Sequence, residues 1–325
     1  MVIDKDYYNT ILCQAFSPCG KFLFAGDIQG NISVFNLDKI IDPPDEQDIQ
    51  YRKAKWKFDS KTYQVCSLLS TDSFLINGGI GEINGWDWKA VTGESKTPKV
   101  AWNIQIPTNR DVLEKTDVNV LKLDPTKNHL YAGCGDNNIY VFSLEDGKLV
   151  RTLTGHTDFI HWLHILGNQM VSASEDGNVK LWDLREKNAH SQIVPHKNDK
   201  LARPNLGKWI GTVTVNEDWL VCGGGPRLSL WHLRSLDVAT IFPLSDNGIH
   251  VTNIYEDRIM AGGTAPYFYQ FSYSGDVYAE IPSSSSTIYS AIVQETPKVL
   301  CTAGSSFKID ICTNFNYRDQ ILTLY

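Results

Sequence analysis

The chain has 325 residues, 42% of them hydrophobic, and a formal net charge of −7. This acidic balance disfavours sequence-independent binding to nucleic acid, which needs clustered Lys and Arg. No segment approaches the roughly 18 apolar residues of a membrane span, and the seven scattered cysteines form no Cys-x-x-Cys pair, so we expect a protein of a reducing compartment, cytosolic or nuclear.

A two-strand pattern recurs seven times along the chain. Each copy has an apolar run, a polar turn and a second run of alternating polarity, as expected for paired β-strands. The second runs end at Phe35, Trp86, Phe142, Trp182, Trp231, Phe271 and Cys312. Longer spacings than the roughly 40–45 residues of a four-stranded repeat place insertions at residues 37–61, 89–117 and 185–208.

The fourth copy is the most complete. Gly155-His156 opens it, residues 171–174 and 179–182 form its two strands, and Trp182-Asp183 closes it. This is the pattern of a WD repeat, and such a unit buries its apolar faces only by stacking against further copies.

The repeats therefore predict an all-β protein, a seven-bladed WD-repeat β-propeller. We expect a single domain over residues 1–325, with blades that begin near residues 11, 64, 117, 155, 208, 250 and 287. Two separate β domains are the alternative, which the absence of a linker of distinct composition disfavours.

His156, Asp176 and Trp182, with Ser172 or Ser174, invite a catalytic interpretation because serine, histidine and aspartate are all present. A strand-bound serine lacks a nucleophile elbow. We expect instead a structural polar network, running from the indole N–H through hydroxyl and imidazole to the carboxylate of the turn.

Neither a metal site nor a cofactor is expected. His161 and His164 are three apart on a strand, so they point to opposite faces. Residues 223–227, Gly-Gly-Gly-Pro-Arg, lack the Gly-Lys-Ser/Thr ending of a phosphate-binding loop and are interpreted as a tight turn.

The insertion at residues 185–208 is locally basic, and we expect it to hold the partner-contacting surface. The candidate partner-binding residues are Arg185, Arg203, Lys208 and Trp209, since Arg and Trp are favoured in interface hot spots. A solvated loop is the alternative for the insertion, and inward packing as part of the next strand is the alternative for Trp209.

Several segments are similar to the THO complex subunit 6 family of WD-repeat proteins. They are residues 16–23, 155–161, 175–177, 181–185, 207–211, 218–226, 230–234, 240–243 and 314–318. Generic WD repeats do not carry the Gly-Gly-Gly-Pro of residues 223–226 or the Trp-His-Leu-Arg of residues 231–234.

The resemblance implies a nuclear, non-enzymatic scaffold subunit of the THO complex, within the transcription-export assembly that supports mRNA processing, splicing and export. It implies docking to other THO subunits, notably subunits 5 and 7, and self-association within a higher-order complex. RNA would be contacted only indirectly, through partners, and no membrane is involved.

The alternative function belongs to another class. Trp182, Asp183, Leu184 and Arg185 satisfy the Trp-Asp-x-Arg pattern of substrate receptors for cullin-RING ubiquitin ligases.

Overall fold

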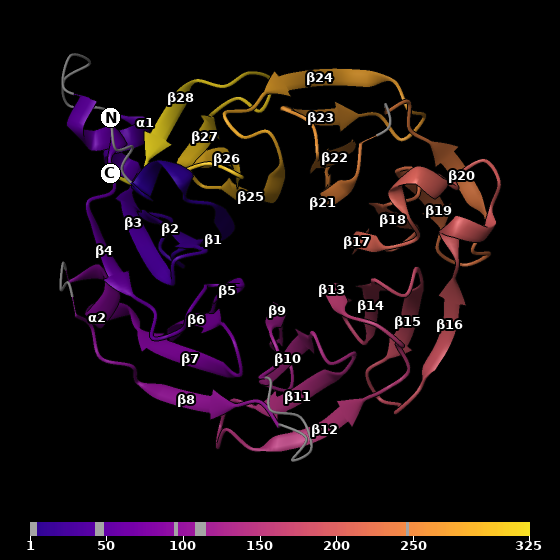
Figure 1. Ribbon diagram of the computed structural model, residues 1–325, viewed down its shortest axis with the longest axis horizontal. Helices are drawn as coiled ribbons and strands as arrows, with labels where there is room; N and C mark the ends of the chain where they lie inside the picture. Colours follow the sequence, from indigo (N-terminus) through magenta and orange to yellow (C-terminus); the bar gives the residue numbers. More distant parts are fainter. Residues whose placement is uncertain (1–4, 43–48, 94–96, 108–114, 245–246) are drawn as a thin grey trace. The chain divides into compact units, whose positions relative to one another are not determined.

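The computed structural model describes residues 5–42, 49–93, 97–107, 115–244 and 247–325. Over these residues the strands form seven antiparallel sheets of four strands each, and the strands of each sheet follow one another in the chain (Figure 1). The predicted all-β, seven-bladed β-propeller is thereby confirmed.

The chain divides into two compact units. The first holds residues 1–115 and 281–325, and the second holds residues 116–280. The single domain remains a prediction.

The first unit contains blades 1, 2 and 7. Their strands are β1 Ile11–Phe16, β2 Phe22–Asp27, β3 Asn31–Asn36 and β4 Trp56–Asp59; β5 Ser67–Ser70, β6 Phe74–Gly78, β7 Glu82–Asp87 and β8 Trp102–Gln105; β25 Ile288–Glu295, β26 Lys298–Gly304, β27 Lys308–Cys312 and β28 Gln320–Thr323.

The second unit contains blades 3 to 6 and ends at residue 280, within β24. Their strands are β9 Val118–Asp124, β10 His129–Cys134, β11 Ile139–Ser143 and β12 Leu149–Leu153; β13 Ile160–Leu166, β14 Gln169–Ser174, β15 Val179–Asp183 and β16 Ala189–Ile193; β17 Ile210–Val215, β18 Trp219–Gly224, β19 Ser229–His232 and β20 Val238–Ile241; β21 Ile249–Tyr255, β22 Arg258–Gly263, β23 Tyr267–Phe271 and β24 Val277–Pro282.

Helical structure is confined to short segments within the described residues. The α-helices are α1 Leu37–Ile41 and α2 Trp88–Thr92, and the 3₁₀ turns are η1 Lys5–Tyr8, η2 Ile49–Arg52, η3 Pro195–Lys197 and η4 Pro204–Leu206. The side chains of Asn36 and Asp87 cap α1 and α2 by accepting a backbone N–H two residues on. The three insertions also supply the outer strands β4, β8 and β16.

The turns between the second and third strands of a blade use residues that tolerate left-handed backbone. Gly30 and Gly177 occupy this position in blades 1 and 4, with φ of 79° and 84°. In blade 3 the same position is Asn137, with φ of 72°, and asparagine is among the few non-glycine residues that adopt it. The polar turns predicted from the sequence therefore have the backbone they need.

Apolar side chains from neighbouring blades form the cores. In the first unit one cluster joins blades 7 and 1 through Ile11, Phe35, Cys301, Ile309 and Leu322. In the second unit another cluster joins blades 4 and 5, with Val179, Ile193, Leu201, Val213 and Trp231 among its members. Burial is continuous along inner strands such as β17, because both faces of such a strand lie within packed layers.

The insertion of blade 1 packs against the last strand, β28. The backbone N–H of Ala54 donates to the carbonyl oxygen of Thr323 at 3.0 Å, and Gln320 Nε2 donates to the carbonyl oxygen of Ile40 at 2.7 Å. Asn9 also donates to the hydroxyl of Tyr325 at 2.8 Å. Segments from the two ends of the sequence are therefore hydrogen-bonded to each other in the first unit.

Candidate functional site

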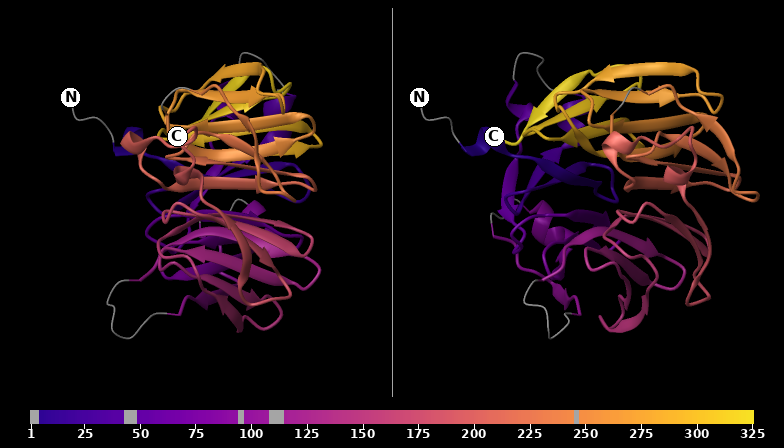
Figure 2. Two further views of the ribbon diagram at one scale, coloured as in Figure 1. Left: turned by 90° about the vertical axis from the view of Figure 1, so that its right-hand side faces the viewer. Right: turned by 45° about the vertical axis from the view of Figure 1, so that its right-hand side comes forward.

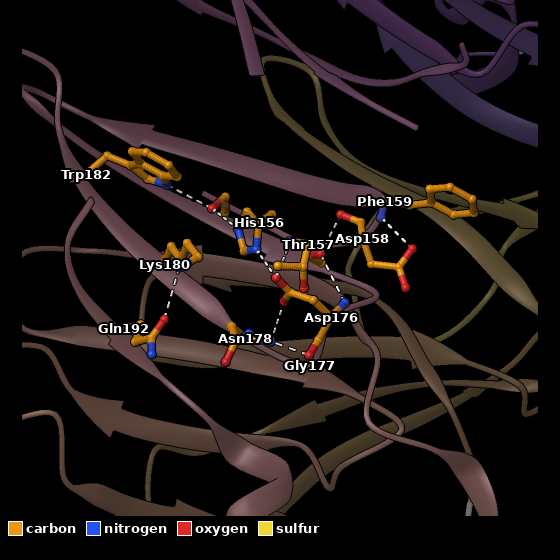
Figure 3. A network of polar contacts seen from close by, with 12 residues as sticks. His156, Thr157, Asp158, Phe159, Asp176, Gly177, Asn178, Lys180, Trp182 and Gln192 are labelled. Atoms are coloured by element: carbon orange, nitrogen blue, oxygen red, sulfur yellow. Dashed lines mark hydrogen bonds and ion pairs between the residues drawn. The ribbon is translucent and has the colours of Figure 1, made fainter. Parts of the chain in front are cut away.

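Blade 4 contains a continuous polar network. Trp182 Nε1 donates to Ser172 Oγ at 2.8 Å, Ser172 Oγ lies 2.7 Å from His156 Nε2, and His156 Nδ1 lies 2.8 Å from an Asp176 carboxylate oxygen. The side chains come from β14, β15 and the turns before β13 and β15 (Figure 3). All four residues are buried.

The proton positions follow from the chemistry of these groups. An indole N–H can only donate, so Ser172 Oγ accepts from Trp182 and uses its own hydrogen to donate to His156 Nε2. The Nδ1–H of a neutral imidazole then donates to Asp176. Each donor in this hydrogen-bond network therefore has an acceptor.

The pKa values of the pair agree with a neutral imidazole and an ionised carboxylate. Burial lowers the pKa of His156 and outweighs the raising effect of the Asp176 carboxylate. Burial acts to raise the pKa of Asp176, but hydrogen bonds from His156 and from the backbone N–H groups of Thr157 and Asn178 hold it well below its usual range.

Ser174 lies beside this network. Its hydroxyl donates to the carbonyl oxygen of Asp158 at 2.9 Å and accepts from the N–H of Asp176 at 3.1 Å. Ser174 therefore fixes the turn that carries Asp176.

Ser172, His156 and Asp176 have the connectivity of a hydrolytic triad without its accessibility. Ser172 has no exposed surface, and the indole of Trp182 occupies its oxygen. A nucleophile has to reach the substrate atom that it attacks. The arrangement joins strands and turns of one blade, and its chemistry is that of a buried, satisfied polar network.

Other blades contain shorter versions of the same arrangement. Trp86 Nε1 donates to Asn77 Oδ1 at 2.6 Å in blade 2, and Trp231 Nε1 donates to Ser229 Oγ at 2.9 Å in blade 5. In blade 1, Asn9 donates to the carboxylate of Asp27, at the end of β2, at 2.8 Å.

The structure places Arg203, one of the candidate partner-binding residues, within the fold. Arg203 is 7% exposed, and its guanidinium donates to the carbonyl oxygens of Gly224, Gly225 and Pro226 at 2.7–3.0 Å. A Cβ on Gly225 would lie 2.3 Å from the carbonyl oxygen of Gly207. The Gly-Gly-Gly-Pro turn thus allows the close approach that holds the end of the basic insertion.

The other candidates lie nearer the surface. Lys208 is exposed. Trp209 is half-buried, with its ring stacked on His250 at 5.0 Å between centroids and its Nε1 donating to the carbonyl oxygen of Leu206 at 2.7 Å. The Arg185 side chain is 68% exposed and forms an ion pair with Asp183. Trp209 thus packs partly inward, and its contact with a partner stays a prediction.

A groove at the junction of blades 4 and 5 was missed by the sequence reasoning. It has a volume of about 410 Å³, and its lining includes Lys197, Trp231 and Leu236. The basic insertion was a signal for Lys197, but nothing in the sequence pattern shows that a strand-closing Trp231 lies beneath it.

The described residues include neither a cluster of metal-ligating side chains nor a membrane-spanning helix. In that part of the chain no group of three or more His, Cys, Asp or Glu side chains is arranged to hold a metal ion. None of the described helices has the length and apolar character needed to cross a membrane.

Four-stranded blades with an indole–hydroxyl–imidazole–carboxylate network define a WD-repeat β-propeller. The family model described as "WD domain, G-beta repeat" accordingly matches residues 5–36 and 147–183. The chain is 38% identical over 316 residues to THO complex subunit 6 homolog of Danio rerio, covering 96% of each chain. It is 39% identical over 318 residues to THO complex subunit 6 of Homo sapiens, covering 96% of this chain and 92% of the relative.

A plant relative is more distant. THO complex subunit 6 of Arabidopsis thaliana is 24% identical over 264 residues, covering 75% of this chain and 69% of the relative. The chain belongs to the THO complex subunit 6 family.

These comparisons give no support to the ubiquitin-ligase alternative. Arg185, on which that alternative depends, donates to both carboxylate oxygens of Asp183 at 2.8 and 2.5 Å. The aspartate and the arginine of the Trp-Asp-x-Arg pattern are thus paired with each other.

Proposed function

We propose that the chain is a non-enzymatic docking subunit of a THO complex and supports mRNA processing and export through protein–protein contacts. The observation that carries this proposal is the similarity to THO complex subunit 6 over 96% of the chain. Because the similarity extends over all the blades, it concerns the whole platform and not one repeat.

The chemistry of the blade network supports a non-enzymatic role. The Ser172 hydroxyl is buried beneath Trp182 and already donates to His156. Strands hold the network rigid, and rigid platforms serve binding through their connecting loops.

The proposed partners are other THO subunits, with subunits 5 and 7 first, and the proposed compartment is the nucleus. Net negative charge favours basic or mixed-charge segments of partners. RNA is then contacted through the partners. The proposed contact residues are Arg185 and Lys208 of the basic insertion and the adjoining Trp209. We also propose that the chain self-associates within the complex.

Affinity purification of the tagged chain from nuclear extract tests the proposal. We expect THO subunits, including 5 and 7, to be recovered at stoichiometric levels and to be retained on size-exclusion chromatography. Recovery of the fully folded chain without any THO subunit would overturn the assignment.

A matched pair of variants tests the contact surface. Lys208→Glu should weaken recovery of the partners, whereas Lys127→Glu, at an exposed turn of blade 3, makes the same charge change and should leave recovery intact. Equal recovery with both variants would remove Lys208 from the interface while leaving membership of the complex in place.

A further inference from the structure

The outer side of blade 1 is basic, although the chain has a net charge of −7. We propose that this side binds single-stranded RNA directly, in addition to the contacts that partners make. We name the surface the blade 1 lysine face; it consists of Lys53, Lys55, Lys57, Lys308 and Tyr7. The choice of RNA over DNA rests on the proposed role in mRNA processing, whereas the site rests on the contacts of these residues alone.

Three of the lysines lie in a row along β4 and the residues just before it. β4 is the outermost strand of its sheet, and the exposure of its side chains alternates. Lys53, Lys55 and Lys57 are exposed, whereas Trp56 and Phe58 are only 7% and 2% exposed. Alternate residues of an extended chain are roughly 6.6 Å apart, so the row of ammonium groups can follow an extended polyanion.

Aromatic rings continue the surface beyond the lysine row. The ring of Tyr325 lies beside Lys57, and its centroid is 5.9 Å from that of Phe307. Tyr7 meets Phe307 edge-on at 5.2 Å between centroids. Figure 2 accordingly shows the indigo 3₁₀ turn η1, which carries Tyr7, beside the C-terminal end of the chain in both views. Because the Tyr7 side chain is 62% exposed, its ring has a face available for stacking.

Two ammonium groups are held over these rings. Lys57 Nζ lies 4.9 Å from the centroid of the Tyr325 ring, and Lys308 Nζ lies 5.6 Å from that of Phe307. Within the described part of the chain neither lysine forms an ion pair. Each therefore keeps N–H donors for an incoming phosphate, since an ammonium group has three.

The carboxylate next along the strand already has a counter-charge. Asp59 is exposed on the same side of β4 as the lysines and forms an ion pair with Lys61 at 2.9 Å. The exposed Asp38 and Asp42 belong to α1 and the residue after it, and the acidic side chains of residues 43–48 lie outside the described residues. At physiological salt, charges more than about 8 Å away are largely screened. The acidic composition of the whole chain therefore does not decide what this face binds.

Single-stranded RNA fits these features better than an acidic protein segment does. The apolar side chains of β4, Trp56 and Phe58, belong to a buried cluster, so the outer side of the strand offers a peptide charge without apolar surface. RNA supplies a phosphate at every residue for the lysine row and an unstacked base for the exposed ring of Tyr7. A duplex keeps its bases stacked inside the helix, so only a single strand can use both features.

Fluorescence anisotropy with the full purified chain tests the proposal. The probe is fluorescein-labelled oligouridylate about eight nucleotides long, within the roughly 4–16 nucleotides of other single-strand sites. A plot of log affinity against log salt concentration should have a slope of about −2, since each of three neutralised phosphates contributes roughly 0.7. Duplex RNA of the same length and a polyglutamate peptide of the same charge are the competitors. We expect each to need a concentration at least about fivefold higher than unlabelled oligouridylate, which corresponds to one stacked base.

A triple variant tests the lysine row. It combines Lys53→Gln, Lys55→Gln and Lys57→Gln, and it should lower the affinity about tenfold or more at roughly 50 mM salt and bring the salt slope close to zero. The matched control makes the same charge change at exposed positions of the second unit and should leave affinity and slope intact; it combines Lys127→Gln, Lys187→Gln and Lys200→Gln. Thermal melts establish that both proteins remain folded.

The aromatic part of the face is tested separately. Tyr7→Ala should weaken binding about fivefold, as the loss of one stacked base does, and should leave the salt slope unchanged because tyrosine neutralises no phosphate. Tyr7→Phe keeps the ring and should bind as the parent chain does. Tyr278→Ala, at a 48% exposed position of the second unit, is the control and should change the affinity little.

Several outcomes would overturn the inference. Equal binding by the triple lysine variant and its control would remove the lysine row, and equal affinities of Tyr7→Ala and Tyr278→Ala would remove the stacking ring. Equal displacement by polyglutamate would assign the blade 1 lysine face to an acidic protein segment, and equal displacement by duplex RNA would contradict a single-strand site. Since these measurements use only the purified chain, their failure leaves the recovery of THO subunits as a separate question.

Discussion

Arg203 donates through Nε to the carbonyl oxygen of Gly225 at 2.7 Å, although the complete hairpin of β17 and β18 separates the two residues in the chain. Further bonds to Gly224 and Pro226 make the guanidinium a fixed link between the basic insertion and the turn after β18. The composition of the insertion places the Arg203 charge at the surface, whereas in the structure this charge holds the insertion to the turn after β18.

Arg203→Ala should lower the free energy of unfolding by about 2–4 kcal/mol, because three buried carbonyl groups lose a charged donor. Arg203→Lys should recover only part of the loss, since an ammonium lacks the planar geometry of the guanidinium. Urea denaturation measures both, with the exposed Lys208→Ala as control. Equal stability of the Arg203→Ala and Lys208→Ala proteins would contradict the structural role.

Trp182→Ala should cost about 3–5 kcal/mol of stability, as other large-to-small aromatic changes in cores do. Trp182 is 1% exposed and also donates to Ser172. Trp182→Phe keeps most of the packing and removes the donor, so it should cost less. His156→Ala should cost about 1–3 kcal/mol by leaving Ser172 and Asp176 unpaired. Denaturant melts in which the Trp182→Phe protein is less stable than the Trp182→Ala protein would contradict this account.

Acidification should destabilise the protein before its surface carboxylates are protonated. Burial, together with the Lys122 ammonium, lowers the pKa of His164 to about 4. Between the ordinary value of 6.5 and about 4 the unfolded chain binds a proton that the folded chain does not, so stability falls as pH falls through this window. Burial of His250 and His156 acts with the same sign.

The His164→Gln protein isolates one part of this effect. Glutamine retains an acceptor for the N–H of Val215, which now donates to His164 Nδ1 at 2.8 Å, but it does not titrate. Its stability should decline less steeply between about pH 6.5 and 4 than that of the parent chain, as followed by urea melts at several pH values. The exposed His190→Gln serves as the control, and identical slopes in all three proteins would refute the assignment.

The whole chain should unfold as one domain in a single transition, although it divides into two compact units. Trp182→Ala lies in the second unit, so it should accelerate hydrogen exchange in β26 of the first unit as well as in β14. Exchange that rises in residues 116–280 alone would show two independently stable domains.

The repeats in the sequence predicted the seven sheets because a blade is a local structure. The strands at residues 171–174 and 179–182 pair through a short turn, and alternation with a closing aromatic is enough to identify such a hairpin. The candidate network was also readable, since the residue types of a WD repeat occupy fixed offsets.

Contacts between residues of different repeats could not be predicted from the sequence. Whether Arg203 points inward depends on where three carbonyl groups some twenty residues later lie in space. Trp209 is half-buried because His250 of the next blade stacks on it. The groove over Trp231 similarly exists only after β16 and the turn at Leu236 are assembled. Composition and periodicity contain no information on such contacts between repeats.

Synthesis of the chain imposes an order on assembly. Residues 116–280 are contiguous, so this unit can complete its contacts while the ribosome is still elongating. Blade 1 emerges before blade 7, so the bonds from Ala54 to Thr323 and from Asn9 to Tyr325 can form only after blade 7 has been translated. Until then, the apolar face formed by Ile11 and Phe35, which later packs against blade 7, stays uncovered. Nascent blade 1 therefore exposes apolar surface to solvent until blade 7 has been translated.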